Sequence, residues 1–318
     1  MTDASPRVFQ TSGAVWLRDF QFGLTHLVVR KTGARVPYSR FVIADVWAWF
    51  SYFAAASRMK PMGPPFTIAY APERARPWYL IWAVARVAGA RLVKEPTSAD
   101  VVMHFEDSTY SPNDPPGRLK RDATLVNYRC RDVSKTRVSE ASATALGAPL
   151  AIDPTTYVGS AVEKSEINAA HDGRIVQCPM NASPGRAYQR LIDNRAENPE
   201  LVEDLRTITV GGKAICVFIK RRPVSKRFLN TNSETVMREP EDVFTPTELE
   251  SIAAFTRAMG MDWGGVDVLR DRADGRLYIV DANKTDMGPP LPLPLPDKLI
   301  ATRKLAHAFR AFALQGRG

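Results

Sequence analysis

The stretch GGVDVLRDRADGRLYIVDANKTDMG, from Gly264 to Gly288, predicts two apolar strands joined by a tight turn. Each strand carries one acid, Asp267 in the first and Asp281 in the second, and Asn283 follows. Residues two apart in a strand share a face, so Asp281 and Asn283 point to the same side. The hairpin therefore gathers oxygen-bearing side chains among residues whose composition favours burial.

The turn decides whether the two aspartates meet. A three-residue loop, Ala273 to Gly275 with Gly275 at positive φ, puts Asp267 directly opposite Asp281. A two-residue loop of Asp274 and Gly275 shifts the register by one residue and separates their faces. Facing carboxylates repel each other and are costly to bury, and a hard divalent cation such as Mg²⁺ removes both penalties. The alternative is a solvated surface hairpin whose acids face water.

Length and composition describe a globular chain with an affinity for anions. The 318 residues are 45% hydrophobic, enough for about two domains. A net charge of +9 favours nucleotides, phosphorylated metabolites, nucleic acid or an anionic membrane surface as partners. Three cysteines without a C-x-x-C pair give no disulfide framework and no zinc spacing. The N-terminus MTDASPRVFQ lacks the features of a signal peptide, so a cytoplasmic protein is expected.

One apolar segment qualifies that expectation. FVIADVWAWFSYFAAA, from Phe41 to Ala56, is shorter than a membrane span and contains Asp45. It predicts a buried helix. The alternative is a membrane-associated protein whose aromatic helix lies on the bilayer surface, flanked by basic residues.

The chain divides into three parts. KPMGPP ends an N-terminal extension, residues 1–65, that is expected to be helical. Residues 66–130 alternate strands and helices, which predicts a Rossmann-like α/β domain with a parallel sheet. His104, Glu106 and Asp107 follow a strand of that sheet, where ligands commonly bind. Residues 131–318 mix helices with antiparallel pairs, including a hairpin at Gly211 and Gly212, so the fold class is α/β (α+β).

Several common sites are missing. No P-loop, dinucleotide fingerprint or nucleophile elbow is present, and the four histidines have no metal spacing. The basic run from Lys220 to Arg227 has little aromatic interleaving, so nucleic acid is not the expected partner. The basic run is more consistent with binding an anionic small molecule.

The hairpin VDV…VDAN, together with the motifs that precede it, resembles the ATP-grasp superfamily, to which ribosomal-protein glutamate ligases and D-alanine–D-alanine ligases belong. The resemblance covers about 127–288. It implies an ATP-grasp fold with a pre-ATP-grasp domain at 66–130, a central lobe at about 131–190 and a C-terminal lobe at about 191–318. It also implies an ATP- and Mg²⁺-dependent ligase, with Mn²⁺ as the alternative metal. Such an enzyme joins a small-molecule or peptide carboxylate to an amine through an acyl phosphate.

The resemblance also implies roles for single residues. Lys135 and Lys164 would contact the nucleotide phosphates, because a flexible ammonium is a good partner for phosphate oxygens. Arg206 would lie on the substrate or γ-phosphate side, and Arg222 would steady the transferred phosphoryl group. The hinge segment would hold the adenosine, with the base framed by Gln189, Arg190, Leu191 and Ile192 and the ribose taken by Asp193. The metal would be held by Asp267, Asp281 and Asn283.

The sequence departs from the family pattern in three places. The segment after Lys164 offers one glycine, Gly173, where the family has a glycine-rich flap. Asp281 stands where many relatives have a longer Glu, so it reaches less far. The polar loop after the arginines leaves open whether Asn230 or Asn232 faces the site.

Two other functions fit the same residues. An ATP-grasp-fold kinase would phosphorylate a small-molecule hydroxyl and stop there. A non-catalytic module would bind the nucleotide, or have lost it, and act as an interaction or membrane-surface protein. The thin flap and the aromatic helix favour this second function.

Overall fold

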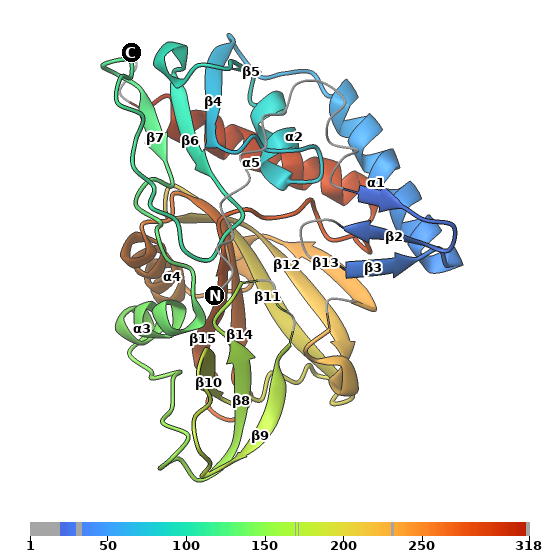
Figure 1. Ribbon diagram of the computed structural model, residues 1–318, viewed down its shortest axis with the longest axis vertical. Helices are drawn as coiled ribbons and strands as arrows, with labels where there is room; N and C mark the ends of the chain where they lie inside the picture. Colours follow the sequence, from blue (N-terminus) through green and yellow to red (C-terminus); the bar gives the residue numbers. More distant parts are fainter. Residues whose placement is uncertain (1–19, 30–33, 169, 171, 230–231, 316–318) are drawn as a thin grey trace.

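The computed structural model describes residues 20–29, 34–168, 170, 172–229 and 232–315. Within them the chain forms sheets and helices in a mixed α and β fold, as predicted (Figure 1). Short 3₁₀ helices are also present: η2 (Pro96–Ser98), η3 (Val224–Lys226) and η4 (Pro240–Asp242).

The extension contains strands as well as a helix. A small antiparallel sheet precedes helix α1 (Arg40–Arg58), with strands β1 (Phe20–Phe22), β2 (His26–Val29) and β3 (Ala34–Pro37). The predicted helix is therefore present, and the strands before it were not predicted.

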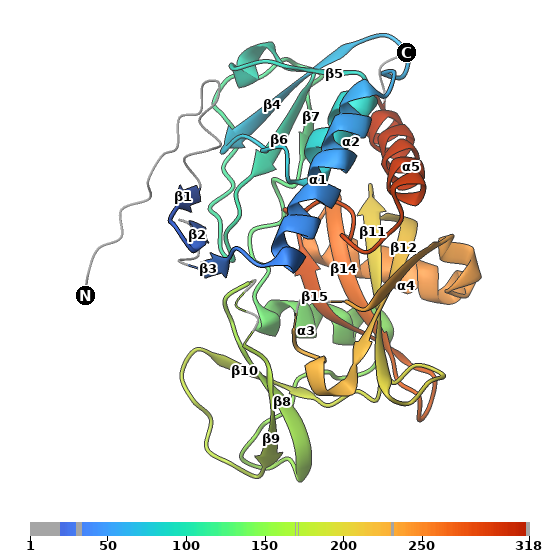
Figure 2. The ribbon, with the colours of Figure 1, turned by 90° about the vertical axis from the view of Figure 1, so that its right-hand side faces the viewer.

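Helix α1 buries only one of its faces. Tyr52 is 4% exposed and its hydroxyl bonds Thr302 of helix α5 (Leu295–Ala313), whereas Trp47 is 74% exposed. Figure 2 shows α1 beside α2 (Leu80–Val87) and α5. The prediction of a buried helix therefore holds for the inner face of α1 and is wrong for its outer face, which is exposed. None of the described helices combines the length and hydropathy that a membrane span requires.

The alternating segment forms the predicted parallel sheet. Its strand order is β5-β4-β6-β7, and every pairing is parallel. The strands are β4 (Phe66–Pro72), β5 (Ala90–Leu92), β6 (Val101–Phe105) and β7 (Thr124–Val126). Each residue of β6 is buried, as expected for an apolar run in a sheet covered on both sides.

Two antiparallel sheets follow. The smaller has the order β10-β8-β9, with β8 (Gly159–Ser165), β9 (Arg174–Cys178) and β10 (Arg186–Arg190). The larger has the order β13-β12-β11-β14-β15, with β11 (Leu201–Val210), β12 (Lys213–Pro223), β13 (Glu234–Arg238), β14 (Trp263–Arg270) and β15 (Leu277–Asn283). The hairpin predicted at Gly211 and Gly212 joins β11 to β12.

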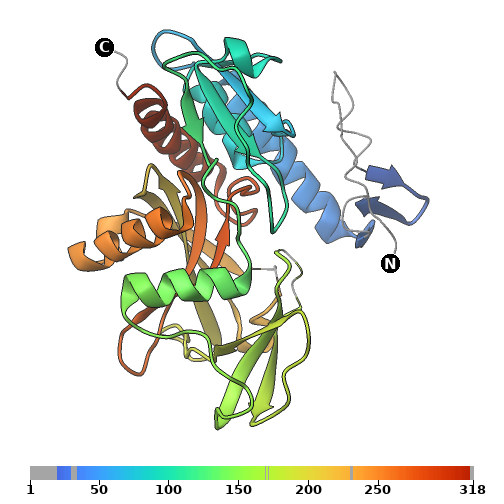
Figure 3. The same cartoon turned by 60° about the vertical axis from the view of Figure 1, so that its left-hand side comes forward.

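The helices give the large sheet two different faces. Helices α3 (Lys135–Leu146) and α4 (Pro246–Met259) pack on one face and close an apolar core there (Figure 3). On the other face α5 covers one end, where the rings of Phe309 and Trp263 meet edge to face at 5.8 Å. The remaining end of that face is turned toward the small sheet, and it carries the charged side chains described below.

Asn127 ties the parallel sheet to the large sheet. It lies directly after β7 at a φ of 62° and is fully buried. Its Nδ2 donates to the carbonyl of Trp263 at 2.9 Å, and its Oδ1 accepts from the backbone N–H groups of Asp262 and Trp263, each at 2.9 Å. This side chain therefore fixes where β14 begins.

We expect Asn127→Ala to lower the free energy of unfolding by about 3–5 kcal/mol, because it leaves three backbone groups without partners. Urea denaturation measures the change. Asn127→Gly is the matched control, because it loses the same hydrogen bonds but adopts the left-handed backbone without strain. The amount by which Asn127→Gly is more stable than Asn127→Ala measures the backbone strain in the Ala variant. A loss below about 1 kcal/mol in the Ala variant would contradict this role.

Candidate active site

The hairpin brings Asp267 and Asp281 face to face. The two residues are direct partners across β14 and β15, as the first of the two registers predicts. The predicted three-residue loop is wrong: Asp271 pairs with Arg276, and a four-residue loop connects them. That loop alone would shift the register by one residue, and a bulge at Val280 shifts it back.

Helix α3 supports this bulge. The backbone N–H of Ile279, next to Val280, donates to the Ser142 hydroxyl at 3.1 Å. A backbone group in the disrupted stretch of the ladder thus finds its partner in a helix from a distant part of the chain. The opposition of the two aspartates depends on that tertiary contact.

Charged side chains alternate along the neighbouring strands. Successive residues of a strand point to opposite faces, so Leu205, Ile219 and Val268 pack into the core under α3 and α4. The residues between them point to the other face and form a charged row: Asp204 and Arg206 on β11, Lys220 and Arg222 on β12, and Asp267 on β14.

A cleft lies between this face and the small sheet. One part of its wall is charged, with Lys135, Lys164, Asp267 and Asp281. Another part is apolar, with Val162, Ile192, Leu269 and Val280. The wall changes from apolar to charged within two residues on each of the strands β8 and β14. On β8 the change runs from Val162 to Lys164, and on β14 from Leu269 to Asp267, a distance of about 7 Å along each strand.

Two cations neutralise Asp267. Arg206 donates to Oδ2 and Lys220 to Oδ1, each at 3.0 Å. These charges hold the pKa of Asp267 well below its usual range, although burial opposes them. Arg206 also pairs with the buried Asp286, whose own pKa is raised by burial. A side chain at Gly265 would clash with both Arg206 and Asp286, so glycine is needed here.

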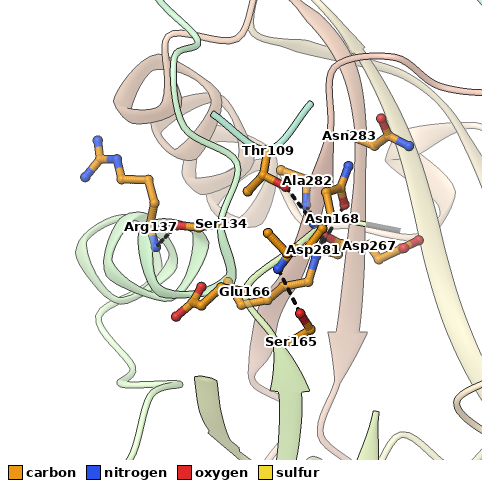
Figure 4. Close-up of polar contacts among 12 residues, drawn as sticks. Thr109, Ser134, Arg137, Ser165, Glu166, Asn168, Asp267, Asp281, Ala282 and Asn283 are labelled. Carbon is orange, nitrogen blue, oxygen red and sulfur yellow. Dashed lines mark hydrogen bonds and ion pairs between the residues drawn. The ribbon is translucent and has the colours of Figure 1, made fainter. Parts of the chain in front are cut away.

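Lys135 neutralises Asp281. It begins α3, which Ser134 caps, and its side chain is 8% exposed. The ammonium donates to Asp281 Oδ1 at 2.6 Å and to Asn168 Oδ1 at 3.3 Å. Figure 4 shows Asn168 and Asp281 together, with Glu166 beside the start of the helix. The predicted phosphate-binding lysine thus lies at the charged end of the cleft.

The segment after β8 is attached to α3. Glu166 accepts from the backbone N–H of Thr136 at 3.0 Å and also pairs with its hydroxyl. The backbone N–H of Asn168 donates to the Thr109 hydroxyl at 2.8 Å (Figure 4). Gly173, the single flap glycine, faces Phe228, and a Cβ would lie 2.8 Å from that ring. Here the glycine makes room for an aromatic side chain.

Lys164 faces the same charges from the small sheet. Burial lowers its pKa to about 8, and Lys135 lowers it further, while Asp281, Asp204 and Asp267 oppose the shift. No ion pair of Lys164 lies within 4.0 Å among the described residues. An ammonium that is partly desolvated and has no close partner is well suited to receive an anionic ligand.

The hinge segment lines the apolar end. Ile192 is buried, Arg190 is exposed, and Gln189 donates to the Ser139 hydroxyl of α3 at 3.0 Å. Asp193 turns to Arg195, which donates to its two oxygens at 2.7 and 2.6 Å. The cleft wall includes Gln189, Arg190, Leu191, Ile192 and Asn194.

Arg222 is buried and fully engaged. It pairs with Asp204 and donates to Asn232 Oδ1 at 2.9 Å and to the carbonyl of Arg227 at 3.0 Å. Of the two asparagines that the sequence left open, Asn232 therefore contacts a cleft residue. Asn230 lies outside the described residues.

The donor set fits a metal ion in part. Asp267 and Asp281 supply two facing carboxylates, the number that Mg²⁺ typically takes from protein. Asn283 Oδ1 instead accepts from the backbone N–H of Thr285 at 2.9 Å and from its hydroxyl at 3.2 Å. Within the described ranges no three His, Cys, Asp or Glu side chains are grouped to hold a metal. A cation here would need further oxygens from its ligand and from water.

The parallel sheet reaches the same region. Asp107, just after β6, accepts from the Thr285 hydroxyl and from the Tyr79 hydroxyl, each at 3.1 Å. His104 is 3% exposed, and burial lowers its pKa to about 4, so it is neutral. Asp107 thus joins the end of β15 to the N-terminal sheet, while His104 belongs to the interior.

Sequence reasoning missed four charged residues of the site: Lys220, Asp204, Asp286 and Arg227. Lys220 and Arg227 are the ends of the basic run that the sequence assigned to an anionic small molecule, without a role for either residue. The available signal was alternation, because Lys220 and Arg222 are two apart on one strand and share a face.

No protein-family model matches the sequence, and no curated protein matches it. Solved structures with a similar arrangement exist. PsnB, an ATP-grasp ligase complexed with a phosphomimetic variant of a minimal precursor, Mg and ADP, is 14% identical with a TM-score of 0.47, over 74% of this chain and 98% of that one.

Two further structures have comparable values. A RimK domain protein of the ATP-grasp type from Sphaerobacter thermophilus is 14% identical with a TM-score of 0.44, over 78% of this chain and 99% of that one. The D-cycloserine synthetase DcsG is 13% identical with a TM-score of 0.45, over 79% and 100%. The function proposed below rests on this chain's own residues.

Because the pKa of Lys164 is lowered, its contribution to the stability of the protein should depend on pH. Below pH 8 the folded chain holds a partly buried ammonium at Lys164. Between about pH 8 and the ordinary value of 10.5, the unfolded chain keeps a proton that the folded chain has released. Removing the charge should therefore stabilise the protein most below pH 8. We expect Lys164→Met to raise the Tm at pH 7, with a gain that shrinks toward pH 10, and to weaken Mg-ADP binding.

Thermal unfolding across pH measures this gain. Lys213→Met, at an exposed lysine of β12, is the matched control and should show no such dependence. Equal destabilisation by Lys164→Met at pH 7 and pH 10 would contradict the desolvated ammonium.

Proposed function

We propose that this chain is a Mg²⁺- and ATP-dependent ligase that joins a carboxylate to an amine. The observation that carries the proposal is the cleft: it is apolar at one end, and at the other end two facing carboxylates stand among lysines and arginines. A nucleotide has the matching shape, with a flat base and an anionic tail.

The base would lie between Val162 and Leu269, which approach from the two sheets. The hinge backbone from Arg190 to Ile192 borders that space. The phosphates would then reach Lys135 and Lys164. Binding an anion there offsets the desolvation of Lys164 and favours its charged form.

Asp267 and Asp281 would hold the magnesium ion, with Asn283 as the predicted third ligand and Mn²⁺ as the alternative metal. A bound divalent cation neutralises phosphate charge and orients the transferred group. In the structure, Lys135, Arg206 and Lys220 neutralise the same carboxylates.

Arg206 and Lys220 would stabilise the charge that develops during phosphoryl transfer, since both lie beside Asp267. Arg222 adds its charge to that of these two at Asp267. The carboxylate substrate, a small molecule or a peptide, would become an acyl phosphate, and the amine would displace the phosphate. Positioning and charge neutralisation suffice for this chemistry, so no protein nucleophile is required.

Removing Asp281 tests the metal end of the cleft. We expect Asp281→Ala and Asn283→Ala each to lower Mg-ATP turnover at least ~100-fold, the scale of losing one preorganised electrostatic group. Asp274→Ala, in the exposed loop of the same hairpin, is the control and should keep full turnover. Near-native turnover in both site variants would overturn the metal assignment.

The products distinguish a ligase from a kinase. Incubating the protein with ATP, Mg²⁺ and a pool of amino acids and small carboxylates, with and without hydroxylamine, should yield a condensed product and a trapped acyl hydroxamate by mass spectrometry. A stable phosphorylated hydroxyl compound would establish the kinase instead. Tight Mg-ATP binding without any product would favour the non-catalytic module.

A further inference from the structure

Helix α1 is attached to the protein by its inner face. The ring of Phe53 stacks on that of Trp49, with centroids 5.4 Å apart, and on that of Trp82 of α2 at 5.1 Å. Tyr52 is buried on the same side and bonds Thr302 of α5. Figure 1 shows α1 at the edge of the molecule, with α2 and α5 on its inner side. The attachment of the helix therefore does not need its outer side chains.

The outer face of α1 carries an apolar stripe. It consists of four side chains with exposed fractions from 42% to 74%: Ile43, Val46, Trp47 and Phe50. They stand at positions i, i+3, i+4 and i+7, so each is next to another on the helix surface. A contiguous exposed apolar patch typically marks a site where a protein binds a partner or a membrane.

A further apolar side chain stands near the start of the helix. Leu24 lies in the turn between β1 and β2 and is fully exposed. The carbonyl of Thr25 accepts from the backbone N–H of Tyr38 at 3.0 Å, and Tyr38 directly precedes Ser39, the N-terminal cap of α1. This hydrogen bond holds the turn next to the N-terminal end of the helix.

The segment that contains the stripe is strongly basic. Residues 20–60 include six lysines and arginines and a single acid, Asp45. Of the basic side chains, Arg35, Arg58 and Lys60 are exposed. The charge of Asp45 is opposed by that of the buried Lys298 on α5. The segment therefore favours an anionic partner.

Three kinds of partner could cover an apolar helix face. A second copy would bring the same basic segment against this one, and like charges repel. A standard interface also buries about 800 Å² on each side, whereas an aromatic side chain supplies about 150–250 Å² at most. An acidic peptide would match the charge, but a peptide typically lays its side chains into a groove, and the stripe lies on the convex surface of a helix. A bilayer surface has no fixed shape and accepts a convex helix.

We propose that the outer face of α1 binds the surface of an anionic lipid bilayer, with the apolar stripe at the level of the headgroups. The inference is independent of the proposed function. A helix that lies on a bilayer combines aromatic and aliphatic side chains on one face with lysines and arginines beside them, as this segment does. Tryptophan is favoured at the boundary between headgroups and acyl chains, because its ring is apolar and its N–H is polar. Trp47 is therefore the main anchor.

Co-sedimentation of the full chain with vesicles tests the proposal. One set of vesicles contains phosphatidylcholine alone, and the other contains equal parts of phosphatidylcholine and phosphatidylserine. We expect binding to the phosphatidylserine vesicles to be at least ~10-fold stronger and to weaken as salt is raised, because salt screens charges near the surface. Binding to neither set, or equal binding to both, would overturn the proposal. This comparison does not depend on any variant folding.

Apolar substitutions test the stripe itself. Trp47→Ser should lower binding to the phosphatidylserine vesicles at least ~10-fold, because the burial of an exposed ring is lost. Ile43→Ser should lower it as well. Ile175→Ser, at an exposed isoleucine of β9, is the matched control for Ile43→Ser and should bind as the wild type does. Equal binding by Trp47→Ser and the wild type would contradict the role of the stripe.

A charge substitution tests the basic part of the surface. Lys60→Gln should lower binding about 5-fold, the effect of one lysine near an anionic bilayer. Lys213→Gln, at an exposed lysine of β12, is the matched control and should leave binding unchanged. Equal loss in both variants would show that net charge alone attracts the protein, and it would overturn the assignment to α1.

Sedimentation velocity without lipid tests the rival partner. A dimer that Trp47→Ser dissociates would overturn the proposal, because a second copy would then cover the stripe. A monomer in both proteins agrees with a stripe that faces a bilayer.

Discussion

Asp267 and Asp281 face each other across β14 and β15, and two facing carboxylates in a partly buried cleft repel unless cations balance them. The balancing charges come from three other elements: Arg206 on β11, Lys220 on β12 and Lys135 at the start of α3. Each cation reaches the pair only if its own element is correctly placed. The charge balance of this pair therefore holds sheet, helix and cleft in one arrangement.

That balance also explains how such a site could accept a nucleotide. Lys135 and Lys164 stand at the same end of the cleft, and among the described residues Lys135 alone of the two is paired with a carboxylate there. In the proposed function, phosphates compete for these ammonium groups while a divalent cation competes for the carboxylates. The net charge of the cleft changes little when both arrive together, which avoids leaving a buried charge without a partner.

Part of this arrangement follows from local sequence. Alternation and turn residues predict the β14–β15 hairpin, the hairpin at Gly211 and Gly212 and the parallel sheet. The opposition of Asp267 and Asp281 was one of two open registers, and the loop from which it was derived does not form. The bulge at Val280 does not follow, because it depends on a tertiary contact between Ile279 and Ser142. Asp204 and Lys220 of the charged row were missed for a related reason: a lysine or aspartate on a strand has the same sequence signal whether it faces solvent or a second sheet.

In the proposed function, Asp267 and Asp281 form the metal end of a nucleotide cleft between the two antiparallel sheets. A crystal structure with Mg²⁺ and a non-hydrolysable ATP analogue tests it most directly. We expect a metal ion bound by both carboxylates, the base between Val162 and Leu269, and Lys135 moved from Asp281 to a phosphate. A nucleotide bound elsewhere, or bound in the cleft with Asp281 still paired to Lys135 and no metal, would contradict it.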